Sequence, residues 1–135
     1  MKILLLGKDG QVGWELQRAV QPLGKVLALN RQTNHAGLCG DVADFARINA
    51  TIHAVKPDII INATAYTAVD KAESDIQQNK LINHLAVNNL AEQCRQIDAL
   101  LVHYSTDYVF NGTGEMPWQE TDTTAPINAY GQAKR

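Results

Sequence analysis

The chain has 135 residues, 45% of them hydrophobic, and a formal net charge of −2. This length and composition are typical of one globular domain with its own core, and the near-neutral charge argues against a nucleic-acid-binding surface. No apolar run is long enough to cross a membrane or to act as a signal peptide, so we expect a cytoplasmic protein. Cys39 and Cys94 are far apart and the histidines lack metal-ligand spacing, so we expect neither a disulfide framework nor a metal site.

The first thirteen residues predict a strand, a glycine turn and the start of a helix. Residues 3–6 are apolar, and Gly7, Gly10 and Gly13 follow at intervals of three. Apolar residues then recur at roughly helical spacing, at Trp14, Leu16, Val20 and Leu23. Such glycines allow a tight turn and a close approach of the backbone to a pyrophosphate, whose charge a helix N-terminus favours. A dinucleotide site is therefore predicted, and a glycine-rich turn without a ligand is the alternative.

The second apolar run, residues 26–30, ends where a dinucleotide-binding fold meets the adenosine ribose. An acidic residue there accepts a hydrogen bond from the ribose 2′-hydroxyl, whereas an arginine pairs with a 2′-phosphate. The chain has Asn30 followed by Arg31, which favours NADP over NAD. The alternative is that Arg31 is simply an exposed loop residue.

Residues 31–40 predict a polar loop with room for a short third strand up to Cys39. Asp41 and Val42 come next. In a nucleotide-binding fold these two residues lie beside the adenine, whereas in the alternative Asp41 only caps the next helix. The sequence leaves both interpretations open.

A helix and a buried strand follow. Apolar residues recur at intervals of three and four, at Phe45, Ile48, Ile52 and Val55, which predicts a helix. Lys56-Pro57 ends the pattern, because proline cannot continue a helix. The unbroken β-branched run at residues 59–61 suits a parallel strand that is covered on both faces. Ala63 and Ala65 lie just past it and leave room for a ligand, because ligands bind at the carboxyl ends of such strands.

The remaining chain continues the alternation of helix and strand. A helical pattern runs from about residue 81 to Ile97, and an apolar strand at residues 100–104 leads into Ser105-Thr106-Asp107. Residues 111–127 contain two glycines and two prolines and predict a long irregular loop. Four or five strands alternating with helices predict an α/β fold: a Rossmann-like doubly wound parallel sheet with helices on both faces.

Tyr130 and Lys134 are four residues apart in the last predicted helix, so they share one face. A phenol titrates near about pH 10, and an ammonium within about 4 to 6 Å lowers that pKa. Such a tyrosine can exchange a proton with a carbonyl at neutral pH. The same spacing also occurs on ordinary solvated helices, but its combination with the glycine turn and a serine-threonine pair at a strand end favours catalysis.

Together these residues resemble the extended short-chain dehydrogenase/reductase family. The shared features are the glycine motif at residues 7–13, the serine and threonine at 105 and 106, and the Tyr130–Lys134 pair. Residues 67–73 and 105–110 are further similar to the branch of the family that reduces a 4-keto dTDP-sugar. The resemblance extends over the whole chain.

The resemblance implies NAD(P)H-dependent reduction of the C4 ketone of dTDP-6-deoxy-L-lyxo-4-hexulose to dTDP-L-rhamnose, a sugar donor for bacterial surface polysaccharides such as lipopolysaccharide. It also implies that Tyr130 donates the proton, that Lys134 holds the nicotinamide ribose and lowers the tyrosine pKa, and that Thr106 hydrogen-bonds at the reacting centre. Thr106 and Asp107 are the residues expected at the substrate. Those expected at the cofactor are Gly7, Gly10, Gln11, Val12, Gly13, Asn30, Arg31, Asp41, Val42, Ala63, Ala65, Thr67, Tyr130 and Lys134.

In this family the sugar-nucleotide-binding part follows the Tyr-Lys helix, as does an acidic region linked to magnesium and dimerisation. We therefore expect residues 1–135 to be an incomplete NAD(P)-binding Rossmann domain, truncated after the Y-x-x-x-K motif and inactive alone. Any Mg²⁺ ligands and any homodimer contacts of the parent would lie outside this chain. Asn30 stands where relatives often carry aspartate, which argues against strict use of NAD. The alternatives are a nucleotide-sugar epimerase or dehydratase of the same family and a non-catalytic NADP-binding regulatory subunit.

Overall fold

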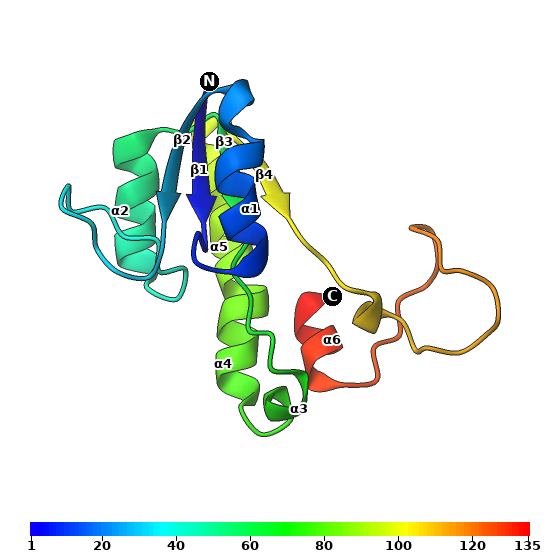
Figure 1. Ribbon diagram of the computed structural model, residues 1–135. Coiled ribbons are helices and arrows are strands. Elements are labelled where there is room, and N and C mark those ends of the chain that lie inside the picture. The colour runs from blue at the N-terminus through cyan, green and yellow to red at the C-terminus, as the bar shows by residue number, and fades with distance from the viewer.

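A computed structural model describes residues 1–135 and contains one four-stranded sheet. Its strands are β1 (Lys2–Leu6), β2 (Lys25–Leu29), β3 (Ile59–Asn62) and β4 (Leu100–His103), in the spatial order β2-β1-β3-β4 (Figure 1). Every neighbouring pair is parallel, so all the carboxyl ends lie at one edge. The chain runs from β1 to β2 on one side of β1 and then crosses back to β3 on its other side. The strand order therefore reverses between β1 and β3, and the carboxyl end of β1 is the topological switch point where ligands of such sheets bind.

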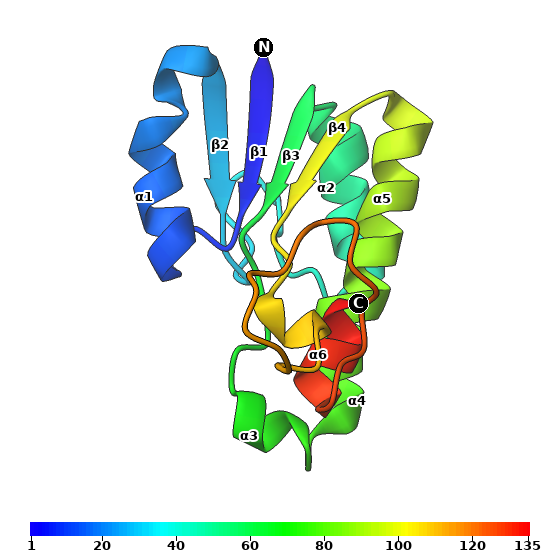
Figure 2. The same cartoon turned by 90° about the vertical axis from the view of Figure 1, so that its right-hand side faces the viewer.

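Helices cover both faces of the sheet, as the sequence predicts. α1 (Gln11–Ala19) lies on one face, and α2 (Phe45–Val55) and α5 (Ala86–Ile97) lie on the other (Figure 2). The side chains of β1 alternate accordingly: Ile3 and Leu5 join the cluster on the α1 side, and Leu4 and Leu6 join the larger one. The doubly wound α/β fold is therefore confirmed.

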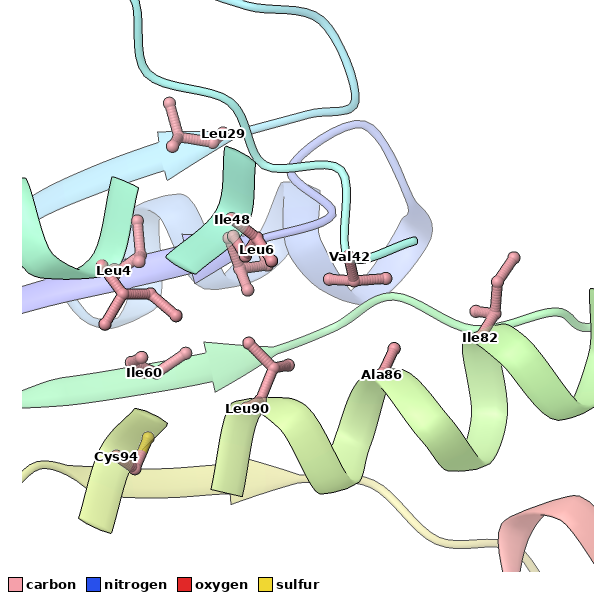
Figure 3. Close-up of a cluster of buried hydrophobic side chains, with 11 residues drawn as sticks. Leu4, Leu6, Leu29, Val42, Ile48, Ile60, Ile82, Ala86, Leu90 and Cys94 are labelled. Atoms are coloured by element: carbon pink, nitrogen blue, oxygen red, sulfur yellow. The ribbon is translucent and has the colours of Figure 1, made fainter. Parts of the chain in front are cut away.

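The larger core cluster joins three strands to α2 and α5. Its central side chains, among them Leu4, Leu6 and Ile60, are fully buried (Figure 3). Val42 and Ile82 extend the cluster past the carboxyl edge of the sheet (Figure 3). The surface at the carboxyl edge of the sheet is thus supported by buried, closely packed apolar side chains, which is a suitable base for a binding site.

Two expectations about the first half of the chain are wrong. The predicted third strand before Cys39 is absent, because the Asn34 side chain closes this loop by accepting hydrogen bonds from the N–H groups of Ala36 and Leu38. The first helix ends at Ala19, and residues 21–23 form a separate 3₁₀ turn at Pro22, which lacks an N–H. Trp14 lies within α1 and is 61% exposed.

The long helical pattern before β4 is confirmed, with one irregularity. α4 (Ile76–Lys80), the π-helical segment η2 (Leu81–Leu85) and α5 follow one another without a break. α4 extends beyond the carboxyl edge of the sheet, where the short α3 (Val69–Ala72) lies beside it (Figures 1 and 2). A π-helical turn inside a helix is frequently associated with a functional site.

The last elements also lie beyond the carboxyl edge. The 3₁₀ helix η3 (Asp107–Val109) packs against α6 (Ala129–Lys134), and residues 111–127 between them contain neither helix nor strand, as predicted (Figure 2). The Asn128 side chain caps α6 by accepting from the Gly131 N–H at 2.7 Å. Among all these helices, none combines the length and apolar character needed to cross a membrane.

Candidate functional site

The glycine turn joins β1 to α1 through contacts that leave no space for side chains. Gly7 has φ +86°, a conformation that favours glycine, and a Cβ there would lie 3.0 Å from the Ala63 carbonyl carbon. A Cβ on Gly13 would lie 2.0 Å from the Gly7 oxygen. The start of α1 is therefore held directly against the carboxyl end of β1 and beside the end of β3.

Gly10 occupies a different environment from the other two glycines. It is the N-cap of α1, has no side chain to cap the helix, and is exposed. A Cβ there would meet only the Gly7 oxygen, at 3.4 Å. The first N–H groups of a helix have no partner inside it, and the dipole makes that end positive. The backbone at Gly10 is thus open to an anion such as a pyrophosphate.

A cleft of about 410 Å³ lies beside this turn, over the switch point of the sheet. Its walls come from the glycine turn, the end of β2, residues 40–43, the end of β3 and the α4–η2 helix. The predicted residues that line it are Gly7, Gly10, Asn30, Arg31, Asp41, Val42, Ala63 and Ala65. Apart from these eight, it is lined by Asp9, Gln32, Gly40, Ala43, Thr64, Gln78 and Ile82.

At one end of the cleft, two hydrogen bonds determine the orientation of the Asn30 side-chain amide. Its amide nitrogen donates to Asp9 Oδ2 at 2.7 Å, and its amide oxygen accepts from the Gln32 N–H at 3.1 Å. The guanidinium of the neighbouring Arg31 is exposed and has no hydrogen bond or ion pair. This end of the cleft therefore presents both a carboxylate, from Asp9, and a free cation.

Asp41 does not cap the following helix. Its Oδ1 accepts from the Ala43 N–H at 3.0 Å, and the N-cap of α2 is Asp44, which accepts from the Arg47 N–H. The capping interpretation of Asp41 is therefore wrong. The side chain of Asp41 instead closes a turn on the cleft wall.

A second polar cluster surrounds the Tyr130 hydroxyl. Burial raises the Tyr130 pKa above its ordinary value, contact with the Thr106 hydroxyl partly offsets this, and the Asp107 charge raises it further. The Tyr130 ring packs edge-on against Tyr108, with the ring centres 5.7 Å apart. At neutral pH the phenol therefore holds its proton, which is the state a proton donor needs.

Lys134 shares this region but does not act on the phenol as predicted. Its ammonium donates to the Tyr104 carbonyl oxygen at 2.7 Å, and burial lowers its pKa. The expectation that Lys134 lowers the Tyr130 pKa is wrong in this structure, because burial dominates at the phenol and the ammonium is held at Tyr104.

Asn62 and His103 connect the second cluster to the cleft. Asn62 is 1% exposed at the end of β3, and its amide oxygen accepts from both the N–H and the hydroxyl of Thr64 in the cleft wall. Its amide nitrogen therefore faces His103 Nδ1, at 3.2 Å, which makes that nitrogen the acceptor. Burial and the nearby Lys134 ammonium both lower the His103 pKa, so the ring favours its neutral form.

All 135 residues match the sequence family described as the RmlD substrate binding domain. The chain belongs to this family.

Named relatives agree with this RmlD assignment. The chain is 51% identical over 134 residues to dTDP-4-dehydrorhamnose reductase of Escherichia coli K12, matching 99% of this chain and 44% of that protein. Its fold superposes with a TM-score of 0.90 on a crystal structure of a dTDP-4-dehydrorhamnose reductase from Clostridium acetobutylicum, at 35% identity over 99% of this chain and 46% of that one. A Bacillus anthracis dTDP-4-dehydrorhamnose reductase in complex with NADP gives 0.89 at 30% identity, over 98% and 46% of the two chains. The chain thus spans less than half the length of these relatives.

Some residues predicted at the cofactor lie outside the cleft of this RmlD-family chain. They are Gln11, Val12, Gly13, Thr67, Tyr130 and Lys134. Gly13 is buried against Gly7, where its role is close packing, and Thr67 is exposed beyond the end of β3. Gln11 and Val12 are exposed at the start of α1. The structure brings Tyr130 and Lys134 together with Thr106 and Asp107 beyond the end of β4.

Several residues of the site were not predicted. Asp9 lies inside the glycine motif, and its carboxylate accepts a hydrogen bond from Asn30, the residue predicted at the adenosine ribose. The acidic residue within the motif was the signal that could have predicted it. Gln78 and Ile82 give no local signal, because only the course of the α4–η2 helix brings them to the cleft. No group of three or more histidine, cysteine, aspartate or glutamate side chains is arranged to hold a metal ion.

Proposed function

We propose that these 135 residues are the cofactor-binding segment of a dTDP-4-dehydrorhamnose reductase. The reaction is reduction of the C4 ketone of dTDP-6-deoxy-L-lyxo-4-hexulose to dTDP-L-rhamnose, with NADPH or NADH as the reductant. The observation that carries the proposal is the glycine-turn cleft and the Tyr130 cluster at one edge of the sheet, linked by Asn62 and His103. The matches to named reductases support the substrate class. Our proposal leaves most of the sugar-nucleotide contacts to the part of those relatives that this chain does not cover.

The cleft fits an NAD(P) cofactor on its own geometry. The open backbone at Gly10 and the first turn of α1 would hold the pyrophosphate, and Asn30, Asp41 and Val42 would line the adenosine end. Ala63 and Ala65 lack bulky side chains and would border the nicotinamide half. The bound nicotinamide would supply a hydride to the sugar ketone.

The second cluster provides the proton that this reduction requires. Reduction of a ketone leaves an alkoxide, and a protonated Tyr130 would donate its phenolic proton to that oxygen. Thr106 would hydrogen-bond at the same centre, and Asp107 would lie near the sugar. Lys134, fixed at the Tyr104 carbonyl, would hold the nicotinamide ribose.

The proposal is tested with the full-length protein, NADPH and the 4-keto dTDP-sugar. We expect NADPH absorbance to fall and dTDP-L-rhamnose to appear in equal amount, measured by chromatography. A folded protein that consumes no NADPH would contradict the reductase assignment. A tightly held nicotinamide that never exchanges would instead indicate an epimerase or dehydratase.

Arg31 is expected to set a preference for NADPH. An unpaired guanidinium at the adenosine end can pair with the 2′-phosphate, which NADH lacks. Replacing Arg31 with alanine should weaken NADPH binding by about tenfold, the effect of losing about 1.4 kcal/mol, and should leave NADH binding within twofold. Fluorescence titration with both cofactors measures this. Arg18→Ala, on the exposed side of α1, is the control. Equal weakening of both cofactors would show that Arg31 does not read the 2′ position.

A further inference from the structure

Ala129, the residue immediately before Tyr130, has both of its backbone polar groups hydrogen-bonded to side chains from other elements. The Ala129 N–H donates to Glu73 Oε1 at 2.7 Å, and the Ala129 carbonyl accepts from Asn79 Nδ2 at 2.8 Å. Glu73 follows α3, and Asn79 lies in α4. The first turn of α6 is therefore tied to two residues 56 and 50 positions earlier in the chain.

The Asn79 amide has its orientation determined by a second asparagine. Asn79 is 1% exposed, and its Oδ1 accepts from Asn83 Nδ2 at 2.7 Å, so its own nitrogen must point toward Ala129. Asn83 lies in the π-helical segment and binds both backbone groups of Tyr66, accepting from the N–H and donating to the carbonyl. One buried amide pair thus connects the loop after β3 to the helix that carries Tyr130.

α6 depends on these external contacts. As in any helix, its first N–H groups have no partner within the helix. Asn128 satisfies the Gly131 N–H, and Glu73 satisfies that of Ala129 with a carboxylate, which also suits the positive end of the helix. Without Glu73 or Asn79, we expect the first turn of α6 to be held less firmly and Tyr130 to shift with it.

We propose that Glu73 and Asn79 are positioning residues that set the place of the Tyr130 hydroxyl during proton transfer. The proposal rests on the reductase function proposed above. Neither residue lines the cleft, so their effect is directed at the proton donor and not at cofactor binding. Residues 67–73, singled out above for their similarity to one branch of the family, do not line the cleft. The contact of Glu73 with Ala129 assigns a function to this segment.

The test compares Glu73→Ala and Asn79→Ala in the full-length protein with matched controls. Asn89→Ala removes an asparagine that bridges α5 to Asn49 in α2, and Glu92→Ala removes an exposed carboxylate paired with Arg95; both lie away from α6. We expect kcat to fall about ten- to a hundredfold in the two test variants, because a small misplacement of a reacting group has effects of this size. The Kd for NADPH should change far less than kcat, because Lys134 at the other end of α6 keeps its own hydrogen bond to the Tyr104 carbonyl. Glu73→Gln, which keeps an acceptor oxygen, should restore most of kcat.

Two readouts separate positioning from general loss of structure. The solvent deuterium isotope effect on kcat should increase, because a displaced phenol makes proton transfer slower. Amide hydrogen exchange at residues 129–134 should accelerate, while exchange in β1 and β3 stays unchanged. The exchange measurement does not depend on turnover.

The outcomes distinguish the two proposals. Absence of turnover in the unsubstituted protein would contradict the reductase function, whatever the variants do. An active protein whose Glu73→Ala variant keeps its kcat, its isotope effect and its exchange at α6 would overturn the positioning role. Because Glu73 is exposed, this variant carries the test even if loss of the buried Asn79 prevents folding.

Discussion

Replacing Tyr130 with phenylalanine in the full-length protein is expected to lower kcat by about 10²- to 10⁴-fold, the usual contribution of a positioned proton donor. The change removes only the hydroxyl, so the edge-on packing against Tyr108 at 5.7 Å remains. NADPH binding should stay within about twofold, because the phenol is outside the cleft proposed to hold the dinucleotide. Steady-state kinetics with the keto-sugar and a separate NADPH titration measure the two effects.

The pH dependence of the unsubstituted protein gives a second test of Tyr130. Since the Tyr130 pKa is raised by burial and by Asp107, the protonated phenol persists to higher pH than an ordinary tyrosine. For the unsubstituted protein we expect kcat to fall only as the pH rises past the ordinary tyrosine pKa of about 10. Tyr108→Phe is the control, since it removes the neighbouring phenol and keeps its ring. A Tyr130→Phe protein with unchanged kcat would show that another group donates the proton.

Replacing Gly13 with alanine is expected to destabilise the fold and abolish NADPH binding together. The new Cβ would lie 2.0 Å from the Gly7 oxygen and 2.8 Å from its carbonyl carbon, and both are backbone atoms that no rotamer change can move. α1 would have to shift away from β1, at a cost of about 1–3 kcal/mol or more in the free energy of unfolding. Urea unfolding of the 135-residue chain and NADPH titration measure the two losses.

Gly10→Ala is the matched comparison for this prediction. Its Cβ would meet only the Gly7 oxygen, at 3.4 Å, so the free energy of unfolding should change little. NADPH binding should still weaken, because the methyl group would project where the pyrophosphate approaches the backbone. If Gly13→Ala unfolds at the same urea concentration as Gly10→Ala, the close packing of the turn is not what requires glycine at position 13.

Much of the fold was predictable because burial leaves a local pattern in sequence. The apolar run at residues 59–61 became β3, and the pattern from Phe45 to Val55 became α2, ended by Lys56 in a left-handed conformation. The glycine motif likewise encodes its own turn, because each glycine lies where a Cβ would clash or would block the open backbone. The strand predicted before Cys39 is absent, because the Asn34 side chain accepts hydrogen bonds from backbone N–H groups that a strand would use for pairing. The local pattern of residue types does not report such a competing hydrogen bond.

The sequence by itself therefore determined the order of strands and helices, the glycine turn, and the Tyr130–Lys134 pair on one helix face. Only the tertiary structure decided how the two halves of the site meet. The Asn62–His103 contact, the hold of Lys134 on the Tyr104 carbonyl, and the grip of Glu73 and Asn79 on Ala129 join residues up to 56 positions apart. The physical reason is that periodicity reports only whether a side chain is buried, whereas a hydrogen bond depends on the direction of both partners. That direction is set only when the sheet and its helices have packed.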